Sequence, residues 1–292
     1  MLPARGRTAI LDGTRACAGR RQEGAAVTDT TEKPGRLKRF HEKFIVEERF
    51  VSAAARRNLI IIAIVLMVVG VSAFLFILDS VLEADDVSAI DKPVEAWLEG
   101  ARADWLTTVM AVIAFVFGPI VMPIIALVTT VAWGILARHA WRPILLAGGM
   151  LLGLVLVQAL APIIDRQRPP ISEMLLEVDK TASFPSGHVM GVADFLFITT
   201  YLVFSRHRNT IVAVFAYIVA TAIVLLTAAC RIYLGYHWAT DALASISLSL
   251  FVLGLVILVD VWRTVRVRPP GMSDQEASGD TFGERGDASA GS

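Results

Sequence analysis

Three short segments of the sequence combine residue types that can bind an anion and move protons. They cover 165–169, 183–188 and 231–241. Arginine side chains in these segments offer forked N–H donors that match phosphate oxygens. Histidines from two of the segments allow one imidazole to attack while the other moves a proton. These residue types predict an anion site with nucleophile chemistry.

Four residues in these segments suit the binding of phosphate oxygens. Arg168 and Arg231 supply guanidinium donors. Ser186 can cap a helix that begins beside it and leave the N-terminal amides of that helix pointing at the anion. Gly187 has no side chain, so a ligand can approach its backbone closely. We expect these four residues to surround one anion.

Three further residues suit the chemical step. His237 and Asp241 are four residues apart, which places them on one face of a helix, where the carboxylate can orient the imidazole and stabilise its charged form. His188 comes from a different helix. A single histidine at a helix start is more often structural, but the joint occurrence of these residues favours catalysis.

The elements that must position these residues are membrane helices. The chain has 292 residues, 55% of them apolar, and a mean hydropathy of +0.62, which is too hydrophobic for a soluble domain of this length. The 27 basic and 27 acidic residues cancel, so no excess charge indicates nucleic acid as a partner. Stretches that fit a membrane span cover 58–78, 106–137, 143–164, 186–205, 209–230 and 237–262. The sequence predicts an all-α integral membrane bundle of six transmembrane helices.

The charges orient this multi-pass bundle in the cell membrane. Basic residues gather before the first span and at 138–142, 206–208 and 263–268, which six spans place on one side. The loop 79–105, on the other side, is acidic. Because loops rich in Lys and Arg stay in the cytoplasm, we expect both termini there and the anion site at the outer membrane face.

The chain divides into a membrane domain and two tails. We expect a partly disordered cytoplasmic tail over 1–57, the membrane domain over 58–262 and a disordered cytoplasmic tail over 263–292. The apolar spacing within 37–51 fits either an amphipathic helix on the membrane surface or a solvated linker.

Two features inside the membrane domain need an account. Gly118 and Pro119, with Pro123, predict a kink in the second span. Asp194 is a carboxyl inside a span, where charge is expensive. It fits a protonated or hydrogen-bonded group between helices, near Gln158, better than a residue on a permeation path.

The three segments resemble the signature of the type 2 phosphatidic acid phosphatase superfamily, whose blocks read Lys-x6-Arg-Pro, Pro-Ser-Gly-His and Ser-Arg-x5-His-x3-Asp. The second block is intact at 185–188, and the third is intact except that Cys230 replaces its leading Ser. In the first block Ala161 stands where the family has Lys, and Arg166 is the nearest candidate substitute. The resemblance spans about 58–262 and covers neither tail.

This resemblance implies hydrolysis of a phosphate monoester or pyrophosphate through a phosphohistidine, with no metal or other cofactor. His237 would attack phosphorus while Asp241 holds it, and His188 would protonate the leaving oxygen and then activate water. The residues that would bind the phosphoryl oxygens are Arg168, Ser186, Gly187, Arg231 and, in place of the missing lysine, Arg166.

Several substrates and functions stay open. Aromatic residues flank the expected site and suit a lipid whose phosphate lies at headgroup depth. Polyprenyl pyrophosphate of a bacterial cell envelope is favoured over phosphatidic acid and phosphatidylglycerol phosphate. The alternatives are a polytopic transporter and a catalytically inactive scaffold of the same fold, whereas six apolar spans disfavour the soluble vanadium-dependent haloperoxidases that share the residue pattern. The oligomeric state is open.

Overall fold

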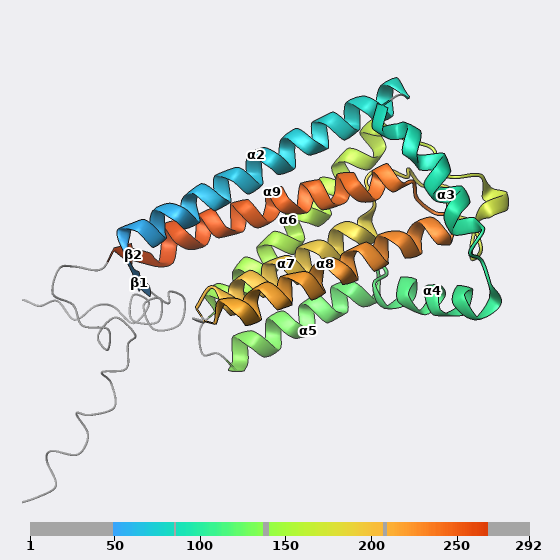
Figure 1. Ribbon diagram of the computed structural model, residues 1–292. Helices are drawn as coiled ribbons and strands as arrows, with labels where there is room; N and C mark the ends of the chain where they lie inside the picture. The colour runs from blue at the N-terminus through green and yellow to red at the C-terminus, as the bar shows by residue number, and fades with distance from the viewer. Residues whose placement is uncertain (1–48, 85, 137–139, 207–208, 268–292) are drawn as a thin grey trace, which may run out of the picture.

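The described part of the chain is a bundle of helices (Figure 1). The computed structural model describes residues 49–84, 86–136, 140–206 and 209–267, and the predictions for residues 1–48 and 268–292 lie outside these ranges. Its long elements are α2 (Ala53–Glu83), α3 (Asp91–Glu99), α4 (Asp104–Val116), α5 (Val121–Leu136), α6 (Trp141–Ile164), α7 (Gly187–Phe204), α8 (Thr210–Tyr233) and α9 (Ala239–Thr264). The short elements are strands β1 (Arg49–Val51) and β2 (Val265–Val267) and 3-10 helices η1 (Asp86–Ile90) and η2 (Ile171–Glu173).

Most of these helices can cross a membrane. In the described ranges, α2, α6, α7, α8 and α9 are each long and apolar enough, and α4 with α5 passes as one span bent by 48°. The bundle therefore has five spans, or up to six with the bent pair, and the expected helical membrane fold is confirmed. The break lies between Val116 and Val121, where Gly118 and Pro119 interrupt the helix, so the predicted kink is also confirmed.

The helix ends differ from the limits of the apolar stretches. Helix α2 begins at Ala53, because Ser52 Oγ accepts a hydrogen bond of 3.1 Å from the amide of Ala55. At the other end of the chain, α9 continues to Thr264, and β2 then pairs in parallel with β1. Residues 49–57 and 263–267, which the sequence placed in the tails, thus belong to ordered elements. Hydropathy marks the membrane interior, whereas capping and strand pairing set the ends.

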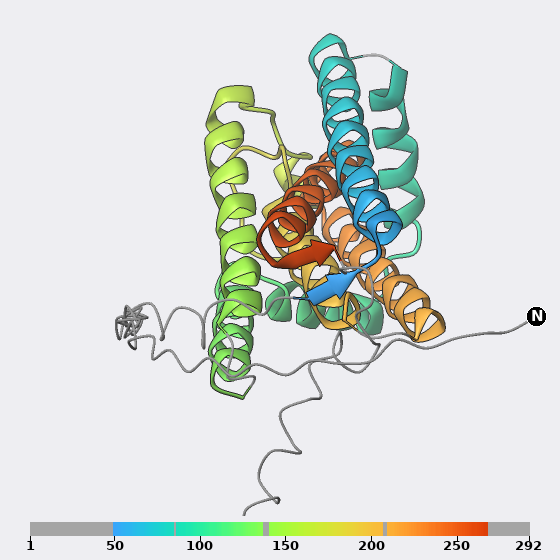
Figure 2. The same ribbon diagram turned by 90° about the vertical axis from the view of Figure 1, so that its left-hand side faces the viewer.

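Helix α9 forms the centre of the bundle. It lies between α2 and α6 (Figure 2) and also packs on α7. A Cβ atom on Gly70 of α2 would lie 2.6 Å from the carbonyl oxygen of Ser247, and one on Gly254 of α9 would lie 2.6 Å from that of Ala63. These two glycines therefore allow α2 and α9 to approach backbone to backbone, as is common between membrane helices.

Asp194 is buried between helices and is not itself among the residues that line the two described pockets. A Cβ atom on Gly153 of α6 would overlap its Oδ2, so the carboxyl packs directly against that glycine. The expectation that Asp194 lies between helices is met, and it packs on α6 against Gly153, which lines the same pocket as Gln158.

A second buried carboxylate ties several elements together at the β1–β2 end. Asp260 of α9 accepts hydrogen bonds from Trp141 Nε1 at 3.0 Å and from Tyr201 Oη at 2.8 Å. Arg49 and Arg206 each lie 3.4 Å from its oxygens. Because a buried charge is costly unless it is paired, these contacts hold β1, α6, α7 and α9 in one arrangement.

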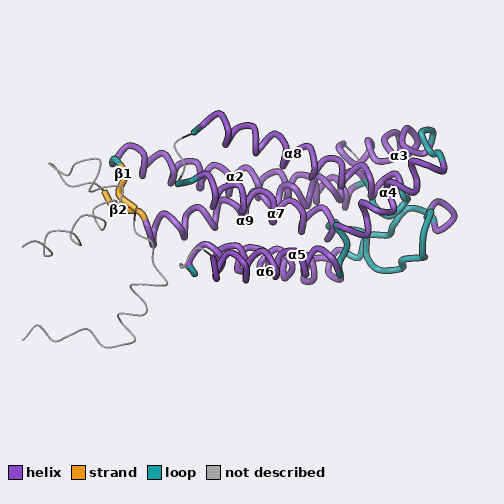
Figure 3. Tube along the Cα trace, turned by 90° about the horizontal axis from the view of Figure 1, so that it is seen from below, coloured by secondary structure: helices purple, strands orange, loops and turns teal. Residues whose placement is uncertain are grey.

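The connections that carry the three chemical segments meet at the opposite end of the bundle. Figure 1 shows α3 far from β1 and β2, and Figure 3 shows the loops gathered at that same far end. The segment 165–186 joins α6 to α7, and 234–238 joins α8 to α9. The fold therefore brings together residues that are about 70 positions apart in the sequence.

Candidate active site

His237 lies in the connection before α9 and is 3% exposed. Its Nδ1 is 2.8 Å from the carbonyl oxygen of Ser183 and 3.4 Å from Asp241 Oδ2. Burial lowers the pKa of this imidazole to about 4, although Asp241 opposes the shift. His237 is therefore neutral at pH 7, with Nδ1–H donating to Ser183 and the lone pair on Nε2.

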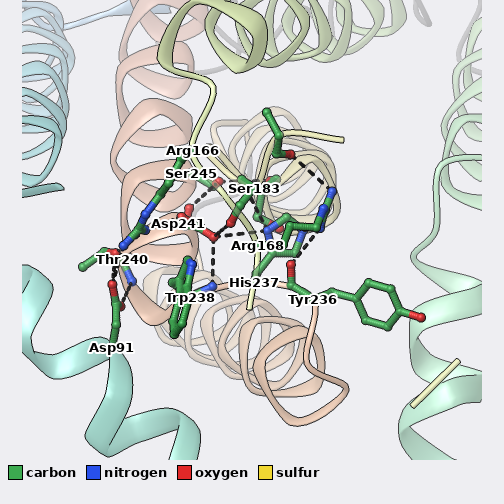
Figure 4. Close-up of polar contacts among 12 residues, drawn as sticks. Asp91, Arg166, Arg168, Ser183, Tyr236, His237, Trp238, Thr240, Asp241 and Ser245 are labelled. Atoms are coloured by element: carbon green, nitrogen blue, oxygen red, sulfur yellow. Dashed lines mark hydrogen bonds and ion pairs between the residues drawn. The ribbon is translucent and has the colours of Figure 1, made fainter. Parts of the chain in front are cut away.

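The helical relationship predicted for His237 and Asp241 is wrong, although the two side chains do meet. Helix α9 begins only at Ala239, so His237 precedes it. The Asp241 carboxylate instead lies at the N-terminus of α9, where it accepts the Trp238 amide at 2.8 Å and the hydroxyl of Ser183. Ser183 thus contacts both the imidazole and the carboxylate (Figure 4).

Arg166 lies behind Asp241, and its expected role as a phosphate ligand needs correction. Its Nη1 donates to Asp241 Oδ1 at 2.5 Å and to Thr240 Oγ1 at 2.7 Å, and its Nη2 pairs with Asp91 at 2.6 Å. Figure 4 shows Arg166 and His237 on opposite sides of Asp241. The chain leaves α6 at Asp165, which has a φ of 45°, and this turn directs Arg166 towards the start of α9.

Asp91 is a site residue that sequence reasoning missed. It opens α3 and is 3% exposed, and its two oxygens accept the Thr240 amide at 2.9 Å and the Thr240 hydroxyl at 2.7 Å. Asp91 therefore caps α9 from a different helix and holds Arg166 against Asp241. The sequence signals for Asp91 are its place in the acidic loop and the resemblance of the run Asp91-Lys92-Pro93 to the outer loop of bacterial family members, and neither predicts a contact with α9.

Arg231 and Ser186 are buried polar groups that keep hydrogen-bonding capacity. Arg231 is 6% exposed, its guanidinium lies 4.4 Å from the centroid of the Tyr236 ring, and its Nε has no hydrogen-bond partner in the described ranges. Ser186 immediately precedes α7, but its hydroxyl makes no cap hydrogen bond, contrary to expectation, and also has no partner among the described residues. Such unpaired donors beside a helix N-terminus fit an anion.

Gly187 and His188 form the first turn of α7. Gly187 is exposed, so its backbone is open to a ligand. The His188 ring approaches the α4–α5 break, because a Cβ atom on Gly118 would lie 3.7 Å from its Nε2. The structure thus joins α7 and the kinked span at one corner of the site.

Arg168 lies beside His237 and is fully engaged. Its Nη1 is 3.2 Å from His237 Nε2 and 2.7 Å from the carbonyl oxygen of Tyr236. Its Nη2 pairs with Asp179 at 2.9 Å. Burial lowers the pKa of Arg168, and Asp179 and Asp241 oppose the shift. Arg168 therefore lies next to the imidazole, and its expected contact with a phosphoryl oxygen stays a prediction.

An apolar pocket of about 330 Å³ adjoins His188. It lies between the α4–α5 break, α6 and α7, and Gln158 and His188 are the polar side chains of its lining. A pocket of this kind can hold hydrocarbon beside the polar site.

The described residues contain no group of three or more His, Cys, Asp or Glu side chains that could hold a metal ion. They instead place arginine side chains, two histidines and a helix N-terminus at one end of a membrane bundle. This combination defines a membrane protein with a site for a phosphate-like anion.

Comparisons with known proteins agree with this class. The family model of the PAP2 superfamily matches residues 142–265. Phosphatidylglycerophosphatase B of Bacillus subtilis (strain 168) is 30% identical over 195 residues, which cover 64% of this chain and 92% of the relative. The crystal structure of a transmembrane PAP2 type phosphatidylglycerolphosphate phosphatase from Bacillus subtilis is similar with a TM-score of 0.58 and 27% identity, over 65% of this chain and 94% of that one.

The chain belongs to the PAP2 superfamily. It is a membrane lipid phosphatase, a hydrolase of phosphoric monoesters, and the family and activity expected from the sequence are confirmed. The phosphatase function is therefore preferred to the transporter alternative.

Proposed function

We propose that this phosphatase removes the terminal phosphate of phosphatidylglycerol phosphate at the outer face of the cell membrane, through a phosphohistidine at His237. The observation that carries the proposal is the state of His237, a neutral buried imidazole whose Nε2 lies next to Arg168. The name of the Bacillus relative supports this lipid over the polyprenyl pyrophosphate favoured from the sequence, and phosphatidic acid is the next candidate.

The proposed reaction has two steps. His237 Nε2 attacks phosphorus, the bond from phosphorus to the lipid oxygen breaks, and His188 donates a proton to that oxygen. His188 then takes a proton from water, which attacks the phosphohistidine and releases inorganic phosphate. Asp241 stabilises the imidazolium, with Arg166, Ser183 and the α9 N-terminus holding the carboxylate in place.

The phosphoryl oxygens are proposed to bind where donors converge. Arg231 and the Ser186 hydroxyl have donors without a partner in the described structure. Gly187 begins α7, so its backbone amide can also donate to the anion. Arg168, in the connection between α6 and α7, supplies a further donor beside His237. The apolar pocket next to His188 supports a lipid substrate, because the acyl chains can remain in hydrocarbon while the phosphate reaches the imidazoles.

Phosphate release by the purified protein in detergent tests this function. We expect faster release from phosphatidylglycerol phosphate than from phosphatidic acid or polyprenyl pyrophosphate, with the same rate in the presence of a chelator. Faster release from another of these lipids would change the assigned substrate. Loss of activity with the chelator would contradict the metal-independent mechanism, and no release from any lipid would favour the inactive scaffold.

Membrane sidedness has its own test. Basic residues lie at the β1–β2 end and the candidate site lies at the other end, which supports an outer site and cytoplasmic termini. In a Cys17→Ser, Cys230→Ser background, we expect Asp104→Cys to react with a membrane-impermeant thiol reagent in intact cells and Thr210→Cys to remain unlabelled. Both positions are exposed at opposite ends of the bundle. The reverse pattern would place the site in the cytoplasm.

A further inference from the structure

Every nitrogen of the Arg168 guanidinium contacts an acceptor within the described structure. Its Nε donates to the carbonyl oxygen of Thr181 at 2.9 Å, and its Nη1 contacts Tyr236 and His237. Its Nη2 reaches the Thr181 hydroxyl at 2.9 Å, the carbonyl oxygen of Ala182 at 3.3 Å and Asp179 Oδ2 at 2.9 Å. An arginine has five N–H donors, so a phosphate can bind Arg168 only by replacing one of these partners.

Asp179 is the partner that a phosphate resembles most. It supplies a carboxylate to Arg168, whereas the other acceptors are neutral. Burial raises the pKa of Asp179, but hydrogen bonds from Thr181 and the charge of Arg168 outweigh it and hold the pKa below its usual value, so the group is ionised at neutral pH. Its charge also acts on Arg231, His188 and His237.

The backbone around Asp179 is tied down independently of Arg168. Tyr236 Oη donates to the carbonyl oxygen of Glu177 at 2.5 Å, and the Leu175 amide donates to the carbonyl oxygen of Leu234 at 3.1 Å. The Asp179 side chain is 34% exposed and lines an outer pocket of about 270 Å³. A displaced carboxylate therefore has space to turn into without movement of the loop.

We propose that Asp179 is a resident anion that occupies Arg168 in the substrate-free enzyme, competes with the substrate phosphate for it, and reclaims Arg168 when inorganic phosphate leaves. This inference rests on the proposed function, because it takes Arg168 as a phosphate ligand. Two arginines and a helix N-terminus would otherwise hold product phosphate tightly, and competition from Asp179 speeds its release.

The affinity for inorganic phosphate tests this role without turnover. We expect Asp179→Asn to bind inorganic phosphate about three- to tenfold more tightly in calorimetry of the detergent-purified protein, because the competing charge is partly exposed. Asn keeps the oxygen that accepts hydrogen bonds from Thr181. Asp179→Ser, which can retain a similar turn, is expected to show the same direction. Unchanged or weaker phosphate binding in folded variants would overturn the proposal.

Two controls distinguish the effect of the Arg168–Asp179 ion pair from a general loss of negative charge near the site. Asp165→Asn removes an exposed carboxylate from the same outer pocket at a φ of 45°, which Asn tolerates, and it should leave the affinity unchanged. In an Arg168→Ala background, Asp179→Asn should no longer tighten binding. Equal tightening by Asp165→Asn, or tightening that persists without Arg168, would contradict the inference. Lipid hydrolysis is measured separately, so loss of the proposed substrate would not be confused with failure of this inference.

Discussion

Replacement of His237 by alanine is expected to reduce phosphate release by about 10⁴-fold or more, because it removes the proposed nucleophile. In wild-type protein, Nδ1–H is held by Ser183, which leaves Nε2 as the attacking atom. Rapid quenching with labelled lipid phosphate should trap acid-labile phosphate on the wild-type protein and none on His237→Ala. Thermal unfolding in detergent verifies that the variant remains folded.

His188→Ala is the matched control for this experiment. With p-nitrophenyl phosphate, whose leaving group needs no proton, the variant should still form the phosphoenzyme and then accumulate it, because water activation is lost. Labelled phosphate on His237→Ala, or hydrolysis by it at the wild-type rate, would exclude His237 as the nucleophile. Failure of His188→Ala to form any phosphoenzyme would place His188 in the first step even with this leaving group.

Arg231→Ala is expected to lower kcat/KM by about 10²- to 10³-fold, the equivalent of about 2.7 to 4 kcal/mol of transition-state stabilisation. Arg231 is nearly buried over Tyr236 and has no carboxylate partner in the described ranges, so its charge is available to the phosphoryl group. The variant should also bind inorganic phosphate more weakly. Steady-state kinetics and phosphate calorimetry measure the two effects.

Arg166→Ala provides the comparison, because it removes the same side-chain type at a position behind Asp241. We expect kcat to fall while phosphate affinity stays close to that of the wild type, since Arg166 contacts Asp91, Thr240 and Asp241. A loss of phosphate affinity as large as that of Arg231→Ala would return Arg166 to the phosphate site. Wild-type kcat in Arg166→Ala would show that Asp241 needs no support from it.

Much of the fold followed from local properties of the sequence. Long apolar runs identify membrane helices because an unpaired backbone is too costly in hydrocarbon. Gly118 and Pro119 located the break in the second span because glycine weakens a helix and a proline within a helix removes one of its hydrogen bonds. The helix ends were less accurate, because the Ser52 cap and the β1–β2 pairing involve backbone geometry that hydropathy does not report.

The candidate site was likewise recognisable by residue type but not by arrangement. Arg168, His188, Arg231, His237 and Asp241 lie in or directly beside apolar spans, where charged and titratable residues are rare unless they are paired or functional, so their joint occurrence indicated chemistry without any structure. The sequence therefore determined which residues could act and approximately which end of the bundle holds them.

Only the tertiary structure decided which arginine lies beside His237. Arg166 and Arg168 are two residues apart, yet Arg166 pairs with Asp91 and Asp241 whereas Arg168 lies beside His237 and Asp179. Those partners come from α3, α9 and the loops before α7 and α9, at sequence separations that no local pattern encodes. A charged side chain takes the partner that best offsets its desolvation, and that partner exists only after distant segments have packed together.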